Sequence, residues 1–408
     1  MIIHLLKSNR HLLFFTFFNL LDKAIIVLLP FVVLNLFEEQ EKYIQLEYII
    51  STVNIIATIS DLGLNGYMFF LYQQSVNKTD AIKTSRQISE VIFILLLVIG
   101  TCIILFHFYI QPLHFLILFI LIRTLFNYIT TFLTSYFRLI DKPVQVLYIS
   151  LTVNVCSLLL LMGFFAYAQP LTLWLIFIPQ LVLVLYYLVR IVSTLDKSSF
   201  SFRASVNTIL KSLEFSWPSI IQVFLMVYMA NYGKVNALDK LPKEDAVFLG
   251  YSLRFCMLIQ LAHASLVGFY AKSILAGEDL LNISTGIMKL YAGTLIFTII
   301  LVVSGTFIYQ AYIIREEHLN ERILLIVLLS MYTLLWCFYS YLEMYYARIN
   351  MNRIKMYLTF AILFVFIVAL KFLPFGLLQN IAYAMFFSIL VGLIANILVL
   401  KKLNFRLL

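Results

Sequence analysis

The chain has 408 residues, of which 63% are hydrophobic and only 12% are charged. A typical soluble domain is about 45–50% apolar and about 25% charged, so a soluble globule, a disordered chain and a coiled coil are excluded. The formal net charge is +9, but the basic residues lie in short segments between apolar runs, which argues against nucleic acid as a partner. The composition indicates an integral membrane protein.

Apolar runs long enough to cross a bilayer recur along the whole chain, since a spanning helix needs about 20 residues. The runs are too long and too irregular for the strands of a β-barrel. We therefore predict an all-α integral membrane protein with twelve transmembrane helices. The predicted helices cover residues 12–36, 43–67, 88–110, 113–137, 143–167, 171–194, 213–231, 246–271, 285–312, 322–347, 357–374 and 380–400.

The twelve helices divide into two sets of six. We predict an N-terminal interfacial segment at 1–11, an N-terminal six-helix lobe at 12–195, a cytoplasmic linker at 196–212, a C-terminal six-helix lobe at 213–402 and a cytoplasmic tail at 403–408. A short internal echo, Leu-Asn-Gly-Tyr at 64–67 and Leu-Val-Gly-Phe at 266–269, supports two repeated halves. Transporters are often built from such halves with the site at their interface, so a central cavity between the lobes is expected.

Lysine and arginine set the orientation, because cytoplasmic loops carry an excess of both. If the N-terminus is cytoplasmic, most of these residues, including Lys83, Arg86 and Arg353, fall on the cytoplasmic side. The outer loops then hold the acidic cluster at 38–41. We predict a multi-pass protein of the bacterial inner membrane with both termini in the cytoplasm.

No catalytic or cofactor motif is present in the loops. The sequence has no Gly-rich phosphate loop, no His/Cys/carboxylate set with metal-ligand spacing and no hydrophilic stretch long enough to fold as a domain. The chain is therefore predicted to be neither an enzyme nor a cofactor-binding protein, and its site is expected within the membrane.

The first helix carries polar residues that are candidates for that site. Asn19 and Lys23 share a helix face, whereas Asp22 points about 100° away among apolar residues. An ionisable residue inside a span costs about 2.5–3.5 kcal/mol, so it normally faces a cavity or a partner. Two readings stay open: Lys23 lines a cationic, water-filled cavity, or it is paired with a carboxylate such as Asp22 or Glu47.

The second helix carries a polar stripe. At helical spacing, Glu47, Asn54, Thr58, Asp61 and Asn65 line one face from end to end. Asp61 lies near the inner end of this helix and is expected to act as a gate or a helix-end residue.

Three later helices carry further candidates. Arg123 and Asn127 share a face of the helix at 113–137, Arg254 lies on a polar face at 246–271, and Glu343 belongs to an aromatic stripe at 322–347 that suits either packing or sugar stacking. The predicted substrate-binding residues are Lys23, Arg123, Arg254, Asn19 and Asn127. The predicted coupling or gating residues are Asp22, Glu47, Asp61 and Glu343.

Four local patterns resemble one family. They are Ser-Asp-Leu-Gly-Leu-Asn at 60–65, Tyr-Phe-Arg-Leu-Ile-Asp-Lys at 136–142, Glu-Phe-Ser-Trp-Pro at 214–218 and Phe-Leu-Gly-Tyr-Ser at 248–252. Together with twelve spans and cytoplasmic termini, they are similar to the Wzx-type polysaccharide flippases of the MOP exporter superfamily. The chain departs from that family in the outer half of the seventh helix, where Tyr228, Asn231 and Lys234 stand in place of an Asp.

The resemblance implies a flippase that moves undecaprenyl-diphosphate-linked oligosaccharide, such as an O-antigen repeat unit of lipopolysaccharide, from the inner to the outer leaflet by alternating access. Its partners would be this lipid-linked substrate, membrane lipids and other proteins of surface-polysaccharide assembly. By location, Lys23 and Arg254 match the cationic cavity lining of the family, and such a lining suits an anionic diphosphate.

Two other functions remain open. A membrane-embedded polysaccharide polymerase or ligase has a similar composition, but such enzymes resemble one another in having a large outer loop, which this chain lacks. A multidrug-type small-molecule exporter would favour carboxylates over cations in its cavity, because many of its substrates are cations.

The charge distribution generates a topology prediction. A reporter fused after Lys42 or Asp245 should read as outside, and one fused after Lys83 or Arg353 should read as inside, because positive loops stay in the cytoplasm. Paired alkaline phosphatase and green fluorescent protein fusions measure this. If the reporter after Asp245 reads as inside, the predicted topology is wrong for the seventh and eighth spans.

Overall fold

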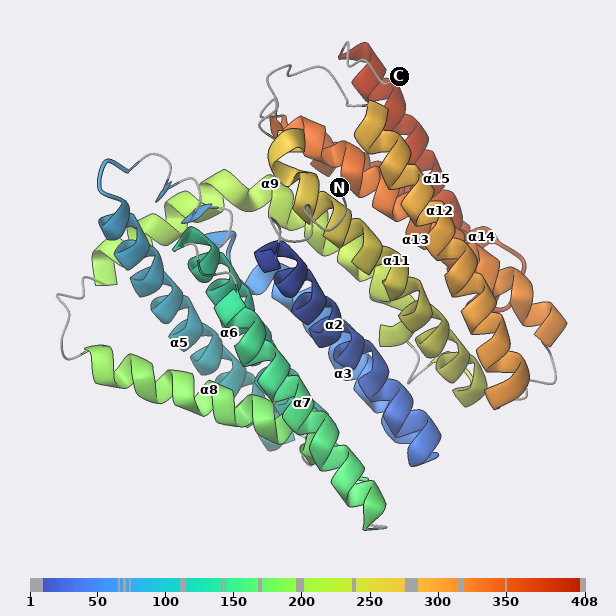
Figure 1. Ribbon diagram of the computed structural model, residues 1–408, viewed down its shortest axis with the longest axis horizontal. Helices are drawn as coiled ribbons and strands as arrows, with labels where there is room; N and C mark the ends of the chain where they lie inside the picture. The colour runs from blue at the N-terminus through green and yellow to red at the C-terminus, as the bar shows by residue number, and fades with distance from the viewer. Residues whose placement is uncertain are drawn as a thin grey trace. The chain divides into compact units, whose positions relative to one another are not determined.

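The computed structural model describes residues 10–64, 67–68, 71–72, 75–110, 115–140, 142, 144–167, 171–195, 202–236, 240–275, 285–314, 319–348 and 351–403. All regular structure within these residues is helical (Figure 1). The chain forms two compact units, residues Met1–Ile220 and Ile221–Leu408. Each of the twelve predicted spans corresponds to a helix, which confirms the all-α fold class.

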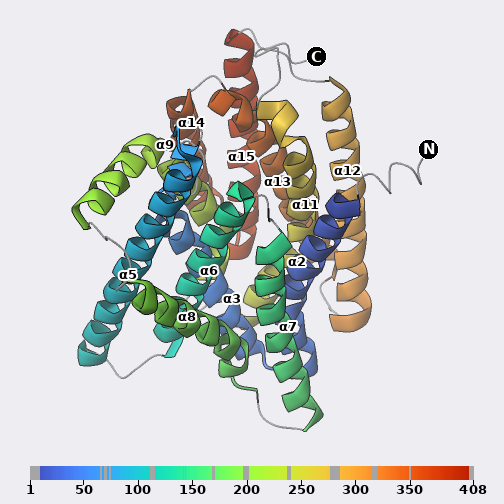
Figure 2. The ribbon, with the colours of Figure 1, turned by 60° about the vertical axis from the view of Figure 1, so that its left-hand side comes forward.

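The first unit contains six complete helices and the start of a seventh. They are α2 (Arg10–Leu36), α3 (Gln40–Ser60), α5 (Lys78–Ile110), α6 (Phe115–Leu139), α7 (Val144–Ala166), α8 (Trp174–Leu195) and the first part of α9 (Phe202–Val235). Helix α6 packs against α3, α5, α7 and α8, while α2 packs against α7, and Figure 2 shows these neighbours from the side. The core around α6 includes Phe93, Ile129 and Phe132.

The second unit contains the rest of α9 and five further helices. They are α11 (Lys243–Leu275), α12 (Thr285–Ile308) with a π-helical turn η1 (Tyr309–Ile314), α13 (Leu319–Arg348), α14 (Asn352–Phe372) and α15 (Leu377–Lys402). Helix α13 packs on α11, α12, α14 and α15. The approach of α15 to α14 needs a glycine, since a Cβ on Gly392 would lie 2.4 Å from the side chain of Ile362.

Nine of the described helices are long and apolar enough to cross a membrane, and the bent helix α9 would make a tenth. The chain is therefore a multi-pass membrane protein. Helices α2 and α3 do not appear among the nine, although both were predicted as spans. In α3 the reason is composition, because Gln45, Glu47 and Asn54 interrupt its apolar run.

The second predicted helix ends earlier than expected. Helix α3 stops at Ser60, Asp61 caps its end, and Leu62 and Gly63 then take positive φ angles of 49° and 73°. Asp61 Oδ1 accepts a hydrogen bond from the Gly63 amide at 3.0 Å, which closes the turn. The predicted stripe from Glu47 to Asn65 is thus interrupted at Asp61, and Asn65 lies outside the described residues.

Helix α9 begins within the predicted linker and bends. Its two segments, Val206–Glu214 and Ser216–Val235, meet at 67°. Pro218 explains the bend, because it has no N–H to donate to the carbonyl four residues earlier, that of Glu214. Residues 202–212 of the predicted linker are therefore helical, and 196–201 lie outside the described residues.

The α3 break and the α9 bend contact each other inside the first unit. Ser212 Oγ donates to the Leu62 carbonyl at 3.1 Å, and Ser216 Oγ donates to the Gly63 carbonyl at 3.2 Å. A Cβ on Gly63 would lie 2.2 Å from the Cβ of Ser216. The carbonyls of the irregular backbone after α3 are therefore satisfied by side chains of α9, as membrane-buried irregular backbone requires.

Replacing Gly63 tests this junction. Gly63→Ala should lower the free energy of unfolding by at least about 1–2 kcal/mol, because alanine resists a positive φ, and the clash with Ser216 adds to the loss. The midpoint of thermal unfolding in detergent measures it. Gly163→Ala is the matched control, since nothing lies within 4 Å of a Cβ there. Equal midpoints for the two variants would contradict a tight junction.

Candidate functional site

Asp22 lies at the centre of a polar cluster in the first unit. Its side chain is 1% exposed. Asn154 Nδ2 donates to Asp22 Oδ1 at 2.8 Å, and Ser150 Oγ lies 3.0 and 3.1 Å from the two carboxylate oxygens. Both donors come from α7, so the buried carboxylate of α2 is held by hydroxyl and amide groups of the neighbouring helix. Hydrogen bonds to an ionised group are among the stronger ones in proteins.

Arg123 joins this cluster through a small cavity. The cavity has a volume of about 20 Å³ and is lined by Arg123, Asn154 and Gln180 together with Leu29 and other apolar side chains. Such a volume has room for about one water molecule. Arg123 is half-buried, and its guanidinium lies 5.3 Å from the ring centre of Phe126. Asn154 thus links two of the predicted residues, because it donates to Asp22 and lines the cavity together with Arg123.

Gln180 adds an acceptor to the same cavity. It is 1% exposed, and its Nε2 donates to the Ile176 carbonyl at 3.4 Å. Within the part of the chain that the structure describes, its Oε1 has no hydrogen-bond partner. Gln180 therefore offers an acceptor to the cavity, which suits water or a small polar group.

The remaining predicted residues of the first unit are more dispersed. Glu47 is buried on α3, Asn127 is half-buried on α6, and Asp61 closes the turn after α3. Asn19 and Lys23 belong to helix α2, but their side chains lie outside the described residues.

In the second unit, Arg254 is a deeply buried cation. Its side chain is 1% exposed on α11, and its Nη1 lies 4.0 Å from the sulfur of Met257. Counting 1.5 Å per residue from Lys243, Arg254 lies about 17 Å along a helix that is about 50 Å long. It is therefore too far from either helix end to reach water along the helix axis.

Glu343 is held by an amide. Gln222 Nε2 of α9 lies 2.7 and 2.6 Å from the two carboxylate oxygens of Glu343, which is 8% exposed. The aromatic residues of the predicted stripe pack inside the unit: Tyr339 and Tyr346 are fully buried, and the Tyr346 hydroxyl donates to Asn396 Oδ1 at 2.8 Å. These two tyrosines serve helix packing.

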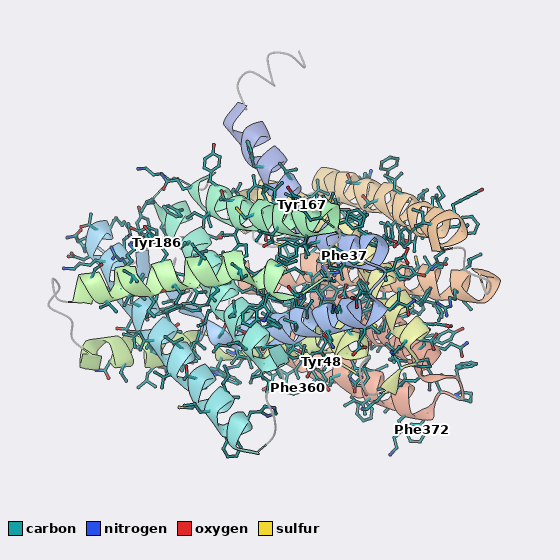
Figure 3. The ribbon with its side chains drawn as sticks, turned by 90° about the horizontal axis from the view of Figure 1, so that it is seen from below. Phe37, Tyr48, Tyr167, Tyr186, Phe360 and Phe372 are labelled. Carbon is teal, nitrogen blue, oxygen red and sulfur yellow. The ribbon has the colours of Figure 1, made fainter. Side chains whose placement is uncertain are left out.

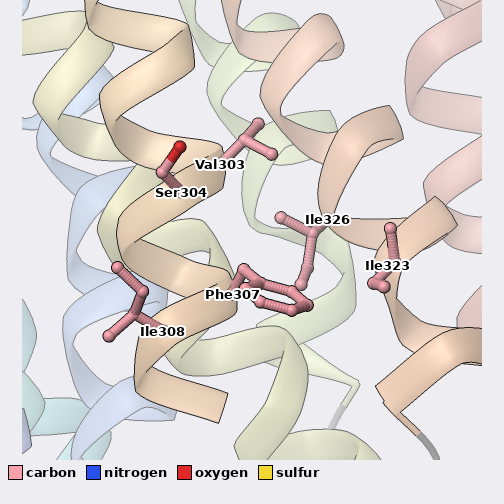
Figure 4. Close-up of a pocket in the computed structure, with 6 residues that line it drawn as sticks. All are labelled: Val303, Ser304, Phe307, Ile308, Ile323 and Ile326. Carbon is pink, nitrogen blue, oxygen red and sulfur yellow. The ribbon is translucent and has the colours of Figure 1, made fainter. Parts of the chain in front are cut away.

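A larger cavity in the second unit has a different character. It holds about 260 Å³ between α12 and α13 (Figure 4). Ser304 is the only polar residue among the six that line it. A lining without charge does not match an anionic headgroup. No group of three or more His, Cys, Asp or Glu side chains that could hold a metal ion occurs among the described residues.

The sequence interpretation missed the partners of both carboxylates. Ser150, Asn154 and Ser157 stand at positions i, i+4 and i+7 of α7, which is a polar stripe that could have been found. Gln222 has no such signal, because its partner Glu343 is 121 residues away.

The fold is similar to those of solved membrane transport proteins. Over 95% of its length the chain matches lipid II flippase MurJ in an inward closed conformation, with a TM-score of 0.62, 13% identity and 87% of that chain covered. It also matches an inward-facing multidrug resistance MATE family transporter of the MOP superfamily, with a TM-score of 0.60, 11% identity and coverages of 97% and 96%.

An outward-facing MATE transporter gives a TM-score of 0.54 at 13% identity, with coverages of 93% and 95%. The chain therefore has the fold shared by this lipid II flippase and these MATE transporters. No protein-family model matches the sequence, and a comparison with curated proteins gives no match.

The Asp22 cluster generates a double-mutant prediction. Asn154→Ala should cost about 1–3 kcal/mol, because it leaves a buried carboxylate with fewer donors. Combined with Asp22→Ala, the two losses should overlap by about 0.5–3 kcal/mol. Thermal unfolding in detergent measures all three variants. Ser157→Ala is the control, since its hydroxyl bonds backbone carbonyls instead. Strict additivity of Asp22→Ala and Asn154→Ala would show that their contact contributes nothing.

Proposed function

We propose that the chain is a flippase that moves undecaprenyl-diphosphate-linked oligosaccharide, an O-antigen or similar repeat unit, across the bacterial inner membrane by alternating access. The observation that carries the proposal is Arg254, a cation that is 1% exposed inside a spanning helix of a MOP-type fold. A flippase of a lipid is among the solved structures with this fold.

The chemistry of an arginine fits the proposed cargo. A diphosphate carries negative charge on non-bridging oxygens, which a planar guanidinium can bind in pairs. Keeping an arginine within a span costs about 2.5–3.5 kcal/mol on insertion scales, and such residues face the bundle interior, where they bind or pair. Arg254 and Arg123, with Lys23, Asn19 and Asn127, are the proposed substrate-binding residues.

The membrane potential assists this direction of transport. The membrane potential is negative on the cytoplasmic side, so it favours outward movement of an anionic headgroup. The contribution is about 2.3 kcal/mol for each charge moved through 100 mV. No cofactor and no chemical reaction is needed for the movement. Membrane lipids and other proteins of polysaccharide assembly are the proposed further partners.

Two buried carboxylates are the proposed coupling residues, one in each unit. Asp22 is held by Ser150 and Asn154, and Glu343 by Gln222. Each carboxylate can exchange its amide donor for a cation, and this exchange would link ion binding to movement of the helix that carries the donor. Glu47 and Asp61 are the proposed gating residues.

A multidrug-type exporter is the second candidate function. The similarity to MATE transporters favours it, and so do the two buried carboxylates, which suit cationic drugs. Its substrates would depend on Asp22 and Glu343 and not on Arg254. A polymerase or ligase is less compatible, because the fold matches transporters and the loops are short.

Replacing the proposed substrate-binding cations separates these functions. Lys23→Ala and Arg254→Ala should each remove most surface glycan, because losing one partner of a desolvated charge pair costs about 2–5 kcal/mol, roughly 30-fold or more in affinity. Arg254→Lys should keep part of the activity, since the charge stays and only the bidentate fork is lost. Surface glycan is measured by complementation of a deletion strain, with protein abundance checked on blots.

Two controls sharpen this test. Arg353→Ala removes an exposed cation of the second unit and should leave surface glycan unchanged. If Lys23 is only paired with Asp22, the double variant Asp22→Ala with Lys23→Ala should restore glycan. Such a rescue would remove Lys23 from the site, and normal glycan in either Lys23→Ala or Arg254→Ala would remove the replaced cation. Changed drug resistance with normal glycan would favour the exporter.

A further inference from the structure

A second polar cavity lies in the first unit, away from the Asp22 cluster. It holds about 170 Å³ and is bounded by the beginning of α5 and the ends of α6 and α8. Helix α5 contributes Arg86 and Glu90, helix α6 contributes Tyr136, and helix α8 contributes Tyr187 and Arg190. None of these residues belongs to the proposed translocation site.

The charged residues of the cavity lie near the ends of the apolar stretches of α5 and α8. The apolar stretch of α5 runs from Val91 to Ile110, about 30 Å at 1.5 Å per residue, which equals the hydrocarbon core. Glu90 directly precedes this stretch, and Arg86 lies one helical turn earlier. Arg190 lies three residues before the end of the apolar span Trp174–Ser193 of α8. Both arginines are therefore placed at one boundary of the bilayer.

An apolar surface leads from the hydrocarbon to the cavity. On α8, Val182, Tyr186 and Val189 are 60%, 65% and 67% exposed, and Figure 3 labels Tyr186. Val182, Tyr186 and Arg190 follow one another at four-residue spacing, so they share one face of the helix. A ligand with an acyl chain and an anionic head would contact the apolar part and the arginine together.

The charge inside the cavity is set by an ion pair. Arg86 Nε donates to Glu90 Oε1 at 2.9 Å, and the Glu90 side chain is only 10% exposed. Glu90 thus orients Arg86 and neutralises one of the two arginine charges. The other N–H groups of the guanidinium point elsewhere and can still donate. The three charged groups leave one net positive charge, which matches the single negative charge of a phosphodiester.

We propose that this cavity binds the phosphate of an anionic membrane phospholipid, whose acyl chain lies along the exposed face of α8. Basic pockets between spanning helices are known to bind lipid head groups. The mixed lining explains the preference for a lipid over a soluble anion, because Phe132, Leu133 and Phe137 also line the cavity. The site does not depend on the proposed transport function.

The test uses the full chain reconstituted in bilayers, with spin-labelled phosphatidylglycerol and phosphatidylcholine as probes. Electron spin resonance gives the relative association constant of the two lipids. The unsubstituted protein should select phosphatidylglycerol. Arg190→Gln should lower this selectivity roughly fivefold, as expected for one basic residue at an anionic membrane surface. Glu90→Gln should raise it, because a negative charge beside the phosphate is removed.

Matched variants exclude simpler explanations. Lys83→Gln removes an exposed cation one turn before Arg86, outside the cavity, and should change selectivity less than twofold. Arg190→Lys should retain most of the selectivity, which guards against a folding defect. An equal loss in Lys83→Gln, or a decrease in Glu90→Gln, would overturn the proposal. So would competition by millimolar inorganic phosphate, which would indicate a site for soluble anions.

Discussion

A polar group inside a spanning helix must find its partner within the protein, because the lipid interior offers none. This constraint sets the packing of each unit. Asp22 fixes the register of α2 against α7 through Ser150 and Asn154. Glu343 fixes α13 against α9 through Gln222. A one-residue slip of either pair would leave a buried carboxylate without donors, so these contacts select one arrangement among many equally apolar ones.

The same constraint governs the backbone where helices are interrupted. The turn after α3 frees carbonyls that hydroxyl groups of α9 then satisfy, through Ser212 and Ser216. Pro218 frees a further carbonyl at the bend of α9. The two interruptions therefore stabilise each other, and both lie near Ile220, where the first unit ends. Helix α9 is thus bent next to the point where the two units join.

The sequence predicts the helices well because a span of about 20 apolar residues leaves little choice of structure. It does not predict the end of α3 at Ser60, since the polar residues from Glu47 to Asp61 keep helical spacing up to the break. Positive φ at Leu62 and Gly63 depends on contact with Ser216, which is distant in sequence. The charged residues of the candidate site can be found from the sequence, because an ionisable residue within a span costs free energy and needs a role. Gln222 and Gln180 are neutral, so the sequence gives no comparable signal for them.

The fold is common to a lipid flippase and to drug exporters, so it does not determine the substrate. The sign of the charge offered to a ligand is more informative. Asp22 is occupied by two donors of α7, and both oxygens of Glu343 face the amide of Gln222. The negative charge of each carboxylate is therefore largely compensated by hydrogen-bond donors of its own unit. Arg254 has a thioether, a weak acceptor, beside its Nη1. A guanidinium buried within a spanning helix suits the proposed anionic cargo better than a cationic drug.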